Sequence, residues 1–330
     1  MIVIAPVAAA LATLALAAAG DTKQRASNPP SPESRAIDYL AREMPRWSRD
    51  NKCFSCHNNG DAARALYTAA RIGYSLPQRA LEDTSRWLAK PQQWDHNGGD
   101  TGVNDRGLAR IQFAAALADA LDAGQVKDSQ ALSRAAELVS EYQDKDGSWK
   151  VDVNGNVGSP ATYGAALATF QARHFLKRAD KYRYRAAIAK AGDWLLQTEV
   201  KSVLDAAAVL LALEDQPARK AADKRRVCLE LIQKGQSSDG GWGPYVSSSP
   251  EPFDTAVVLL SLIPLSDHAD IKARIQRGRA YLISRQETDG SWQETTRPPG
   301  SESYAQRIST TGWATLALLA TRPGDGTSRR

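Results

Sequence analysis

The chain has 330 residues, 42% of them hydrophobic, with a formal net charge of +5 and a pI of about 9.0. This is enough apolar material for one large domain or two smaller ones. The Lys and Arg residues are scattered and do not form a stripe with aromatic residues, so the composition argues against nucleic-acid binding. A solvated basic surface is the simplest interpretation, and an acidic partner or an anionic membrane surface are alternatives.

The first 32 residues have the character of a targeting segment. Residues 1–20 form an apolar run ending in Ala17-Ala18-Ala19, a small-x-small cleavage pattern, and residues 21–32 are a polar linker rich in Pro and Ser. This pattern predicts a secretory signal peptide, although no Lys or Arg precedes the apolar run. The run is also just long enough for an uncleaved membrane anchor. We therefore expect a periplasmic or secreted protein, with membrane anchoring or peripheral association as the alternative.

The segment Cys53-Phe54-Ser55-Cys56-His57 carries the most specific chemical signal in the chain. Cys-x-x-Cys-His is the attachment signature of a c-type haem. Its two thiols, about one helical turn apart, can add to the two vinyl groups of a haem, and the histidine can bind the iron as an axial ligand. The sequence therefore predicts haem c as the cofactor, held by Cys53, Cys56 and His57.

Two other interpretations of the cysteine pair stay open. A disulfide or a thioredoxin-like redox pair is one, but that redox motif belongs to a strand-helix-strand unit and no strand-rich unit is visible. A zinc site is the other; it needs four ligands, and only Cys53, Cys56 and His57 are local. The single further cysteine, Cys228, is expected to be a buried thiol.

One phrase recurs with fixed spacing through the rest of the chain. It appears as Gln143-x-x-Asp146-Gly147-Ser148-Trp149, and again at residues 236–242 and 286–292. Such self-similarity indicates an array of supersecondary units. Asp-Gly supplies a turn, Trp can wedge between adjacent units, and Gln can tie a helix end to the neighbouring loop. We interpret these residues as structural rather than catalytic.

Each copy of the phrase lies between two predicted helices. The preceding helices are amphipathic, and the following helices are more apolar. Amphipathic helices are predicted near residues 33–44, 78–90, 129–142, 186–196 and 271–285, and apolar helices from residues near 61, 105, 162, 205, 255 and 311. An apolar inner layer and an amphipathic outer layer follow from this pattern. We predict an all-α fold in which about six helical hairpins close into an α/α toroid over residues 33–322, followed by a disordered tail at 323–330.

The Gln-x-x-Asp-Gly-x-Trp phrase resembles the QW motif of squalene-hopene cyclases and their prenyltransferase-repeat relatives. The resemblance covers nearly all of the predicted mature chain and is specific for fold more than for function. It implies the α/α toroid and a centre able to hold an apolar or isoprenoid molecule. Protein prenyltransferases of this fold use a zinc held by Asp, Cys and His, but no suitable His lies near Cys228.

The resemblance also locates the position of the cyclase acid. Class II triterpene cyclases protonate an alkene with the middle Asp of an Asp-x-Asp-Asp-Thr-Ala motif, and the matching segment here is residues 251–256. Phe253 stands at the donor position, and a phenyl ring cannot donate a proton. Asp254 is thus only a weak catalytic candidate, and the catalytic residues stay unknown. Asp254, together with Asp61, Asp105 and Asp205, is expected to cap the start of an inner helix.

The repeat pattern gives the haem signature a place in the predicted toroid. The stretch of residues 46–60 is expected to be the first loop between an outer and an inner helix, where the signature replaces the turn phrase. Corresponding loops of adjacent hairpins lie at the same end of a toroid, so His96 of the second loop is the best candidate for a second axial ligand opposite His57. Met44 is an alternative, His174 and His268 lie farther around the ring, and an open sixth position is a further possibility.

Three functions are consistent with the sequence. The first is an exported haem protein that transfers electrons or senses a small ligand, with a redox partner or an apolar small molecule as its counterpart. The second is a terpenoid-cyclase-like, prenyltransferase-like or polysaccharide-acting enzyme. The third is a non-catalytic scaffold in which Cys53 and Cys56 form a disulfide.

Overall fold

In the computed structural model, residues 31–330 form one compact unit. The structure describes residues 30–98, 105–151, 160–214, 216, 218–295 and 303–323. The predicted signal at 1–20 and most of the linker and tail lie outside these ranges, so their assignment stays a prediction. Within the described residues, no helix combines the length and apolar character needed to cross a membrane.

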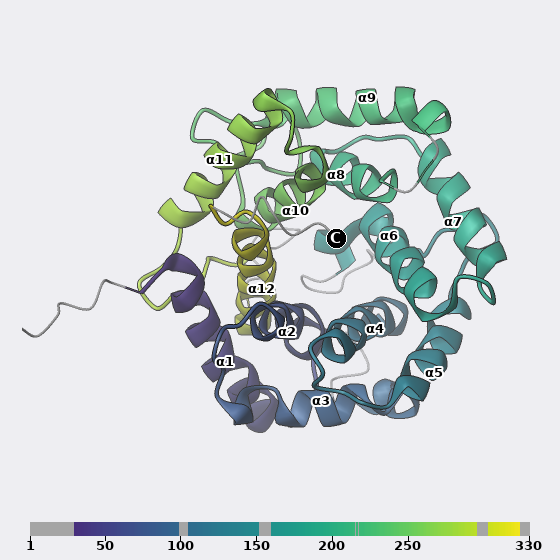
Figure 1. The fold of residues 1–330 in the computed structure, drawn as a ribbon, viewed down its shortest axis with the longest axis vertical. Helices are drawn as coiled ribbons and strands as arrows, with labels where there is room; N and C mark the ends of the chain where they lie inside the picture. The colour runs from purple at the N-terminus through teal and green to yellow at the C-terminus, as the bar shows by residue number, and fades with distance from the viewer. Residues whose placement is uncertain are drawn as a thin grey trace, which may run out of the picture. The chain divides into compact units, whose positions relative to one another are not determined.

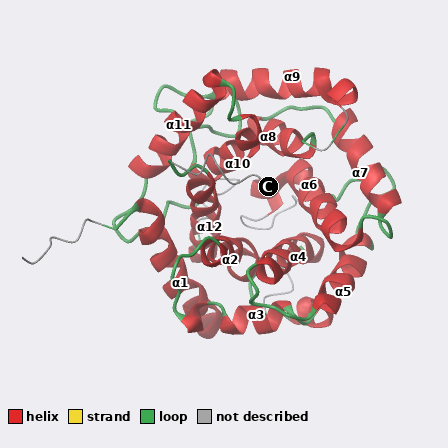
Figure 2. Ribbon diagram, viewed as in Figure 1, coloured by secondary structure: helices red, strands yellow, loops and turns green. Residues whose placement is uncertain are grey.

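The helices of this unit form two concentric rings (Figures 1 and 2). The inner ring consists of η1 (Cys56–Ala62) continued by α2 (Ala63–Arg71), α4 (Arg106–Asp122), α6 (Pro160–Asp180), α8 (Val203–Ala212), α10 (Pro252–Leu262) and α12 (Tyr304–Ala320). The outer ring consists of α1 (Pro32–Asn51), α3 (Glu82–Leu88), α5 (Ser129–Ser140), α7 (Arg185–Gln197), α9 (Ala218–Gly235) and α11 (Ala269–Ser284). Six outer–inner hairpins result, which confirms the predicted all-α toroid.

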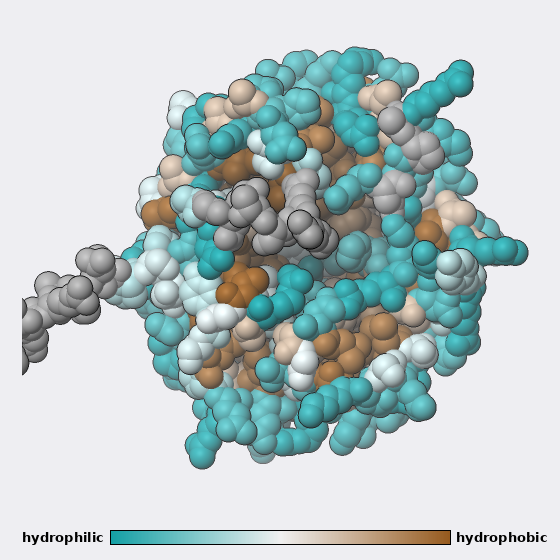
Figure 3. Space-filling view, in the orientation of Figure 1, coloured by the Kyte–Doolittle hydropathy of each residue, from teal (hydrophilic) through white to brown (hydrophobic). Residues whose placement is uncertain are grey.

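Composition explains which helices lie inside. Inner helices pack against two ring neighbours and the outer layer, so they are apolar on most sides; Val257, Val258 and Leu259 of α10 are all fully buried. Outer helices expose one polar face, as the hydrophobic periodicity predicts. Figure 3 accordingly shows hydrophilic residues around the rim of this face and more apolar ones nearer its middle.

The tryptophan of each repeated phrase joins the outer helix and the inner helix of one hairpin. The Trp242 Nε1 group donates a 2.8 Å hydrogen bond to Ile232 O of the preceding outer helix, and the Trp242 backbone amide donates to Thr255 Oγ1 of the following inner helix. Trp149 and Trp292 make the corresponding pairs of bonds. All three indoles are fully buried, which confirms the structural interpretation of the phrase.

The glutamine of the phrase bonds its own turn loop, as expected, because the Nε2 groups of Gln143, Gln236 and Gln286 donate to the carbonyls of Gly147, Gly240 and Gly290. The same glutamine also connects its hairpin to the next outer helix. Gln143 Nε2 donates to Ala187 O of α7, and Gln236 Nε2 donates to Arg274 O of α11. The third copy closes the ring, because Gln286 Nε2 donates to Pro32 O of α1 at 2.9 Å. Position 290 in the same phrase requires glycine, because its backbone has φ 95° and a Cβ there would lie 2.3 Å from Arg35 O.

Two expectations about the first hairpin and the inner helix starts were wrong. Residues 46–51 are not loop, since α1 continues through Pro45 to Asn51, and Cys56 already begins the π-helix η1. Asp105 does cap α4, accepting from Leu108 N at 2.9 Å.

The other three aspartates are not N-caps. Ser202 caps α8, with Asp205 in its first turn, and Asp254 lies in the first turn of α10. Asp61 lies inside η1 and bonds to side chains of neighbouring helices instead.

Candidate functional site

The Cys53–His57 segment connects the first outer helix to the first inner helix. α1 ends at Asn51 because Lys52 adopts a left-handed backbone conformation with φ 50°. Ser55 then opens η1, its hydroxyl accepting a 3.1 Å hydrogen bond from His57 N. Cys56 and His57 are therefore the first residues of an inner-ring helix, at the end of the toroid where inner helices begin.

Cys53 and Cys56 are two free, half-buried thiols. Burial raises the pKa of the Cys56 thiol to about 12, and the nearby Asp61 and Cys53 raise it further in the same direction. Burial also raises the pKa of Cys53. Across the described part of the chain, no three or more His, Cys, Asp or Glu side chains are grouped to hold a bare metal ion. A haem needs less from the protein, because the porphyrin itself supplies most of the iron ligands.

His57 has the geometry of an imidazole that lacks its partner. Its Nδ1 lies 3.4 Å from Ser55 Oγ, whereas Nε2 is buried and has no hydrogen-bond partner among the described residues. Burial lowers the pKa of His57 to about 4, so the ring is neutral at pH 7. A neutral imidazole with one nitrogen oriented by a hydrogen bond and the other free is the form that binds a metal. The residues present therefore fit an axially ligated haem iron.

The second rim loop packs directly on this segment. Phe54 N donates to Asn97 O at 2.8 Å, and a Cβ on Gly98, which has φ 83°, would lie 2.2 Å from Lys52 O. The two loops are thus neighbours, as the repeat analysis predicts. His96 itself is exposed at the end of the 3₁₀ segment η3 (Pro91–His96), so its ligation of iron stays a prediction.

The other candidate ligands lie elsewhere. Met44 is fully buried in the core on α1. His174 lies late in α6, and His268 is the N-cap of the outer helix α11. Cys228 is fully buried in α9, as expected for a structural thiol.

An aromatic cluster packs against the Cys53–His57 segment. The Phe54 ring stacks on Trp87 with centroids 4.6 Å apart and 5° between planes. Phe113 of α4 packs against the Trp87 ring at 6.1 Å and the Trp94 ring at 5.6 Å. Stacked aromatic rings of this kind stabilise beyond their buried area. No motif or spacing in the sequence indicates this role of Phe54.

Asp61 lies four residues beyond His57 and is 2% exposed. Its Oδ2 accepts hydrogen bonds of 2.8 Å from Gln112 Nε2 of α4 and from Ser309 Oγ of α12, the two ring neighbours of η1. Its Oδ1 has no hydrogen-bond partner among the described residues. Burial raises the pKa of Asp61 to about 6, although hydrogen bonds and the Arg64 charge oppose the rise. Asp61 therefore keeps its proton to a higher pH than an ordinary aspartate does, although most of it is ionised at pH 7.

The centre of the ring is crossed by side chains from opposite inner helices. Tyr163 of α6 and Trp313 of α12 meet edge to face at 6.1 Å, and Phe253 packs on the Trp313 ring at 5.6 Å. Arg64 lies over the same indole at 5.2 Å and pairs with Asp119 at 3.0 Å. The sequence signal for this cluster is the Asp61–Arg64 pair in an otherwise alanine-rich inner helix.

Asp254, the weak catalytic candidate, is fully buried in the first turn of α10. Phe253 occupies the adjacent position, where the resemblance places the cyclase acid, and its ring faces Trp313. The structure therefore brings Phe253, not a carboxyl group, to the Trp313 side of the ring centre, while Asp61 reaches that centre from η1.

Comparisons with known proteins agree with this architecture. Residues 205–330 match the family described as squalene-hopene cyclase C-terminal domain. No curated protein matches the sequence.

Solved structures show the same fold at low sequence identity. The type II terpene cyclase MstE from Scytonema, in complex with geranylgeranyl dihydroxybenzoate, is 15% identical with a TM-score of 0.57, covering 88% of this chain and 97% of its own. The ent-copalyl diphosphate synthase from Streptomyces platensis is 18% identical with a TM-score of 0.51, covering 79% of this chain and 50% of its own. A protein from Actinoplanes is 14% identical with a TM-score of 0.56, covering 88% and 98%. The chain thus has the α/α toroid of terpene cyclases.

Proposed function

We propose that this chain is a c-type haem protein built on a terpene-cyclase-like toroid, acting in electron transfer or small-ligand binding. The observation that carries the proposal is His57, a neutral imidazole whose buried Nε2 lacks a hydrogen-bond partner among the described residues, next in sequence to the free thiol of Cys56 and close in sequence to that of Cys53. In a haem-free structure this is the arrangement that a Cys-x-x-Cys-His site should have.

Each residue of the segment has a definite part in this function. Cys53 and Cys56 would hold the haem through thioether bonds, and His57 Nε2 would bind its iron. Ser55 Oγ lies 3.4 Å from Nδ1 and holds the orientation of the ring. The bound haem supplies one-electron chemistry or a ligand-binding iron. The stack of Phe54 on Trp87 holds the segment against the second hairpin.

His96 is the proposed second axial ligand. The support is the backbone hydrogen bond between Phe54 and Asn97, which fixes the loop of His96 against the haem segment. Met44 would have to leave the core to reach the iron. An open sixth position is the alternative, and it would favour small-ligand binding over electron transfer.

The proposal includes export. Covalent haem attachment takes place outside the bacterial cytoplasm, and residues 1–20 carry the pattern of a secretory signal. We therefore infer a periplasmic or secreted protein, anchored at the membrane if the signal is not cleaved. Its counterpart is a redox partner or an apolar small molecule, and not a nucleic acid.

Expression with c-type haem maturation machinery tests the proposal. The purified protein should be coloured, with a reduced α-band near about 550 nm, and intact mass should show one covalent haem. Cys53→Ser with Cys56→Ser should abolish covalent attachment, whereas Cys228→Ser, a matched change of a buried thiol, should keep it. A colourless wild-type protein, or a disulfide between Cys53 and Cys56, contradicts the proposal. His96→Ala should shift the spectrum, and an unchanged spectrum excludes it as a ligand.

A second candidate function is acid-initiated chemistry on an isoprenoid, by a route different from class II cyclases. Phe253 removes the usual donor, but the buried carboxyl of Asp61, with a pKa raised to about 6, faces a centre lined by Trp313 and Tyr163. Aromatic faces stabilise developing cations. Polyprene turnover that is lost in Asp61→Asn and survives in Asp254→Asn would establish this function, and absent turnover in the wild type would reject it.

A further inference from the structure

The second rim loop, which leads from α3 into α4, is anchored differently from the three loops that carry the repeated phrase. It also contains a tryptophan, Trp94, which is 2% exposed. The Trp94 indole N–H has no hydrogen-bond partner among the described residues, whereas the Trp149 indole donates to the preceding outer helix at 2.8 Å. The second loop therefore lacks the tryptophan bond of the repeated turns, and other contacts hold it.

An arginine of the following inner helix supplies one of these contacts. Arg110 of α4 is 8% exposed and donates twice to the carboxylate of Asp95, from Nε to Oδ1 at 2.9 Å and from Nη2 to Oδ2 at 2.5 Å. The guanidinium also lies over the Tyr142 ring at 4.6 Å and donates to Leu138 O at 3.3 Å. Forked arginine–carboxylate pairs fix the relative orientation of both groups. Arg110 is thus itself held in place, and it holds Asp95.

The two neighbours of His96 in the chain are both fixed. Asp95 precedes His96 and is bound to α4, whereas Asn97 follows it and accepts from Phe54 N at 2.8 Å through its carbonyl. The His96 side chain is exposed, although the backbone on either side of it is held. A ligand on such a supported backbone loses little freedom when it binds a metal.

We propose that Arg110 is a positioning residue, which through Asp95 holds His96 where its imidazole binds the haem iron opposite His57. The role of Arg110 rests on the proposed function, with His96 as the second axial ligand. Lysine at position 110 keeps the positive charge but cannot form the fork, because an ammonium group lacks the planar pair of donors. Asp95 is then held less firmly, and His96 leaves the iron more often.

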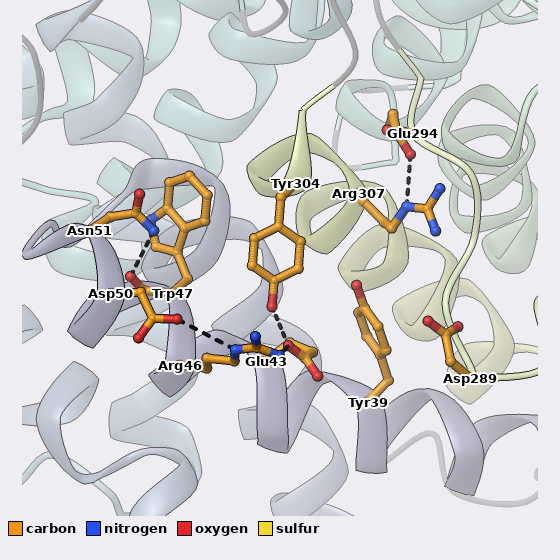
Figure 4. A pocket seen from close by; sticks show the side chains of 10 residues that line it. All are labelled: Tyr39, Glu43, Arg46, Trp47, Asp50, Asn51, Asp289, Glu294, Tyr304 and Arg307. Atoms are coloured by element: carbon orange, nitrogen blue, oxygen red, sulfur yellow. Dashed lines mark hydrogen bonds and ion pairs between the residues drawn. The ribbon is translucent and has the colours of Figure 1, made fainter.

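The last hairpin offers a matched control. Arg307 of α12 donates from Nε to Glu294 Oε2 at 2.9 Å, and Glu294 lies on the loop that leads into α12, as Asp95 lies on the loop that leads into α4 (Figure 4). The sequence of that loop, residues 285–303, contains no His or Met that could bind the iron. Arg307→Lys therefore weakens the same kind of contact in a loop without a candidate ligand.

Cyanide titration of the oxidised, haem-loaded protein, followed by its visible spectrum, tests the role of Arg110. In the wild type cyanide has to displace His96, so the apparent Kd is raised by the fraction of iron that His96 occupies. Arg110→Lys should lower this Kd about tenfold or more, His96→Ala should lower it further, and Arg307→Lys should leave it unchanged. Arg110→Lys added to His96→Ala should have no further effect, because a residue that acts through His96 cannot act in its absence.

The variants separate this role from a general effect on the fold. An unchanged Kd in Arg110→Lys or in His96→Ala overturns the proposal, as does an equal effect of Arg110→Lys in the His96→Ala background or an equal effect of Arg307→Lys. In each case the haem stays attached, as intact mass shows. A wild type without covalent haem instead overturns the proposed function, and the role of Arg110 with it. If Arg110→Lys does not fold, judged by circular dichroism, Asp95→Asn replaces it and should lower the Kd several-fold.

Discussion

Replacing Asp61 by asparagine tests whether the centre of the ring holds a strained carboxylate. Burial raises the pKa of Asp61 from 3.8 to about 6. Between these values the folded protein binds a proton that the unfolded chain has released, so the free energy of unfolding falls as the pH rises through this window. The gap corresponds to about 3 kcal/mol lost by neutral pH. Asparagine carries no charge and keeps an oxygen to accept from Gln112 and Ser309.

Guanidinium denaturation at pH 4 and pH 7.5 measures this effect. Relative to wild type, Asp61→Asn should gain about 2–3 kcal/mol between the two pH values, because only the wild type has to ionise this buried carboxyl. His57 titrates in both proteins, so its contribution cancels in the comparison. Asp205→Asn, a half-buried aspartate in the first turn of α8, is the matched control and should shift much less. An offset that is the same at both pH values would refute the reasoning.

Three further predictions follow from single contacts. In haem-free protein the pKa of His57, lowered from 6.5 to about 4, should make the wild type lose up to about 3 kcal/mol of its free energy of unfolding as the pH falls through that range. His57→Phe should lose less over the same range. Parallel pH profiles of the two proteins would contradict this. Trp242→Phe leaves Ile232 O without its donor and should cost about 1–3 kcal/mol by calorimetric melting; an unchanged melting temperature argues against the anchor. Gln286→Leu should speed proteolysis within α1, whereas Gln143→Leu should not; equal cleavage would show that Gln286 does not close the ring.

The toroid could be predicted from the sequence because its determinants are local and repeated. Each Gln-x-x-Asp-Gly-x-Trp phrase contains both the turn and the anchor, and the same hydrogen bonds recur at Trp149, Trp242 and Trp292. The end of α1 was not predictable in this way. Pro45 normally interrupts a helix. Here α1 continues through it to Trp47 and Asn51, where the helix packs against α12.

The Cys53–His57 motif can be recognised in the sequence, whereas the ring centre cannot, and both facts have the same physical reason. All residues that define the Cys53–His57 motif lie within five consecutive positions. Asp61 instead gains its environment from Gln112, 51 residues away, and Ser309, 248 residues away. Only ring closure brings these residues together, so local spacing at Asp61 indicated a helix cap. The contact between the Trp47 and Tyr304 rings has the same origin, because these residues come from the first and last hairpins.

In the first hairpin the Cys53–His57 segment stands in place of the turn phrase, and contacts with neighbouring residues still hold this hairpin in the ring. In three of the other hairpins a Trp on the turn is hydrogen-bonded to its own outer helix, at Trp149, Trp242 and Trp292. The first turn has no such Trp; it is held by its neighbours, through the Phe54–Trp87 stack and the Phe54–Asn97 hydrogen bond. With this support from the second hairpin, Cys53 and Cys56 form no disulfide, and His57 Nε2 has no hydrogen-bond partner among the described residues. A cofactor bound there would then link the two hairpins, and its loss should loosen the second rim loop before the rest of the toroid.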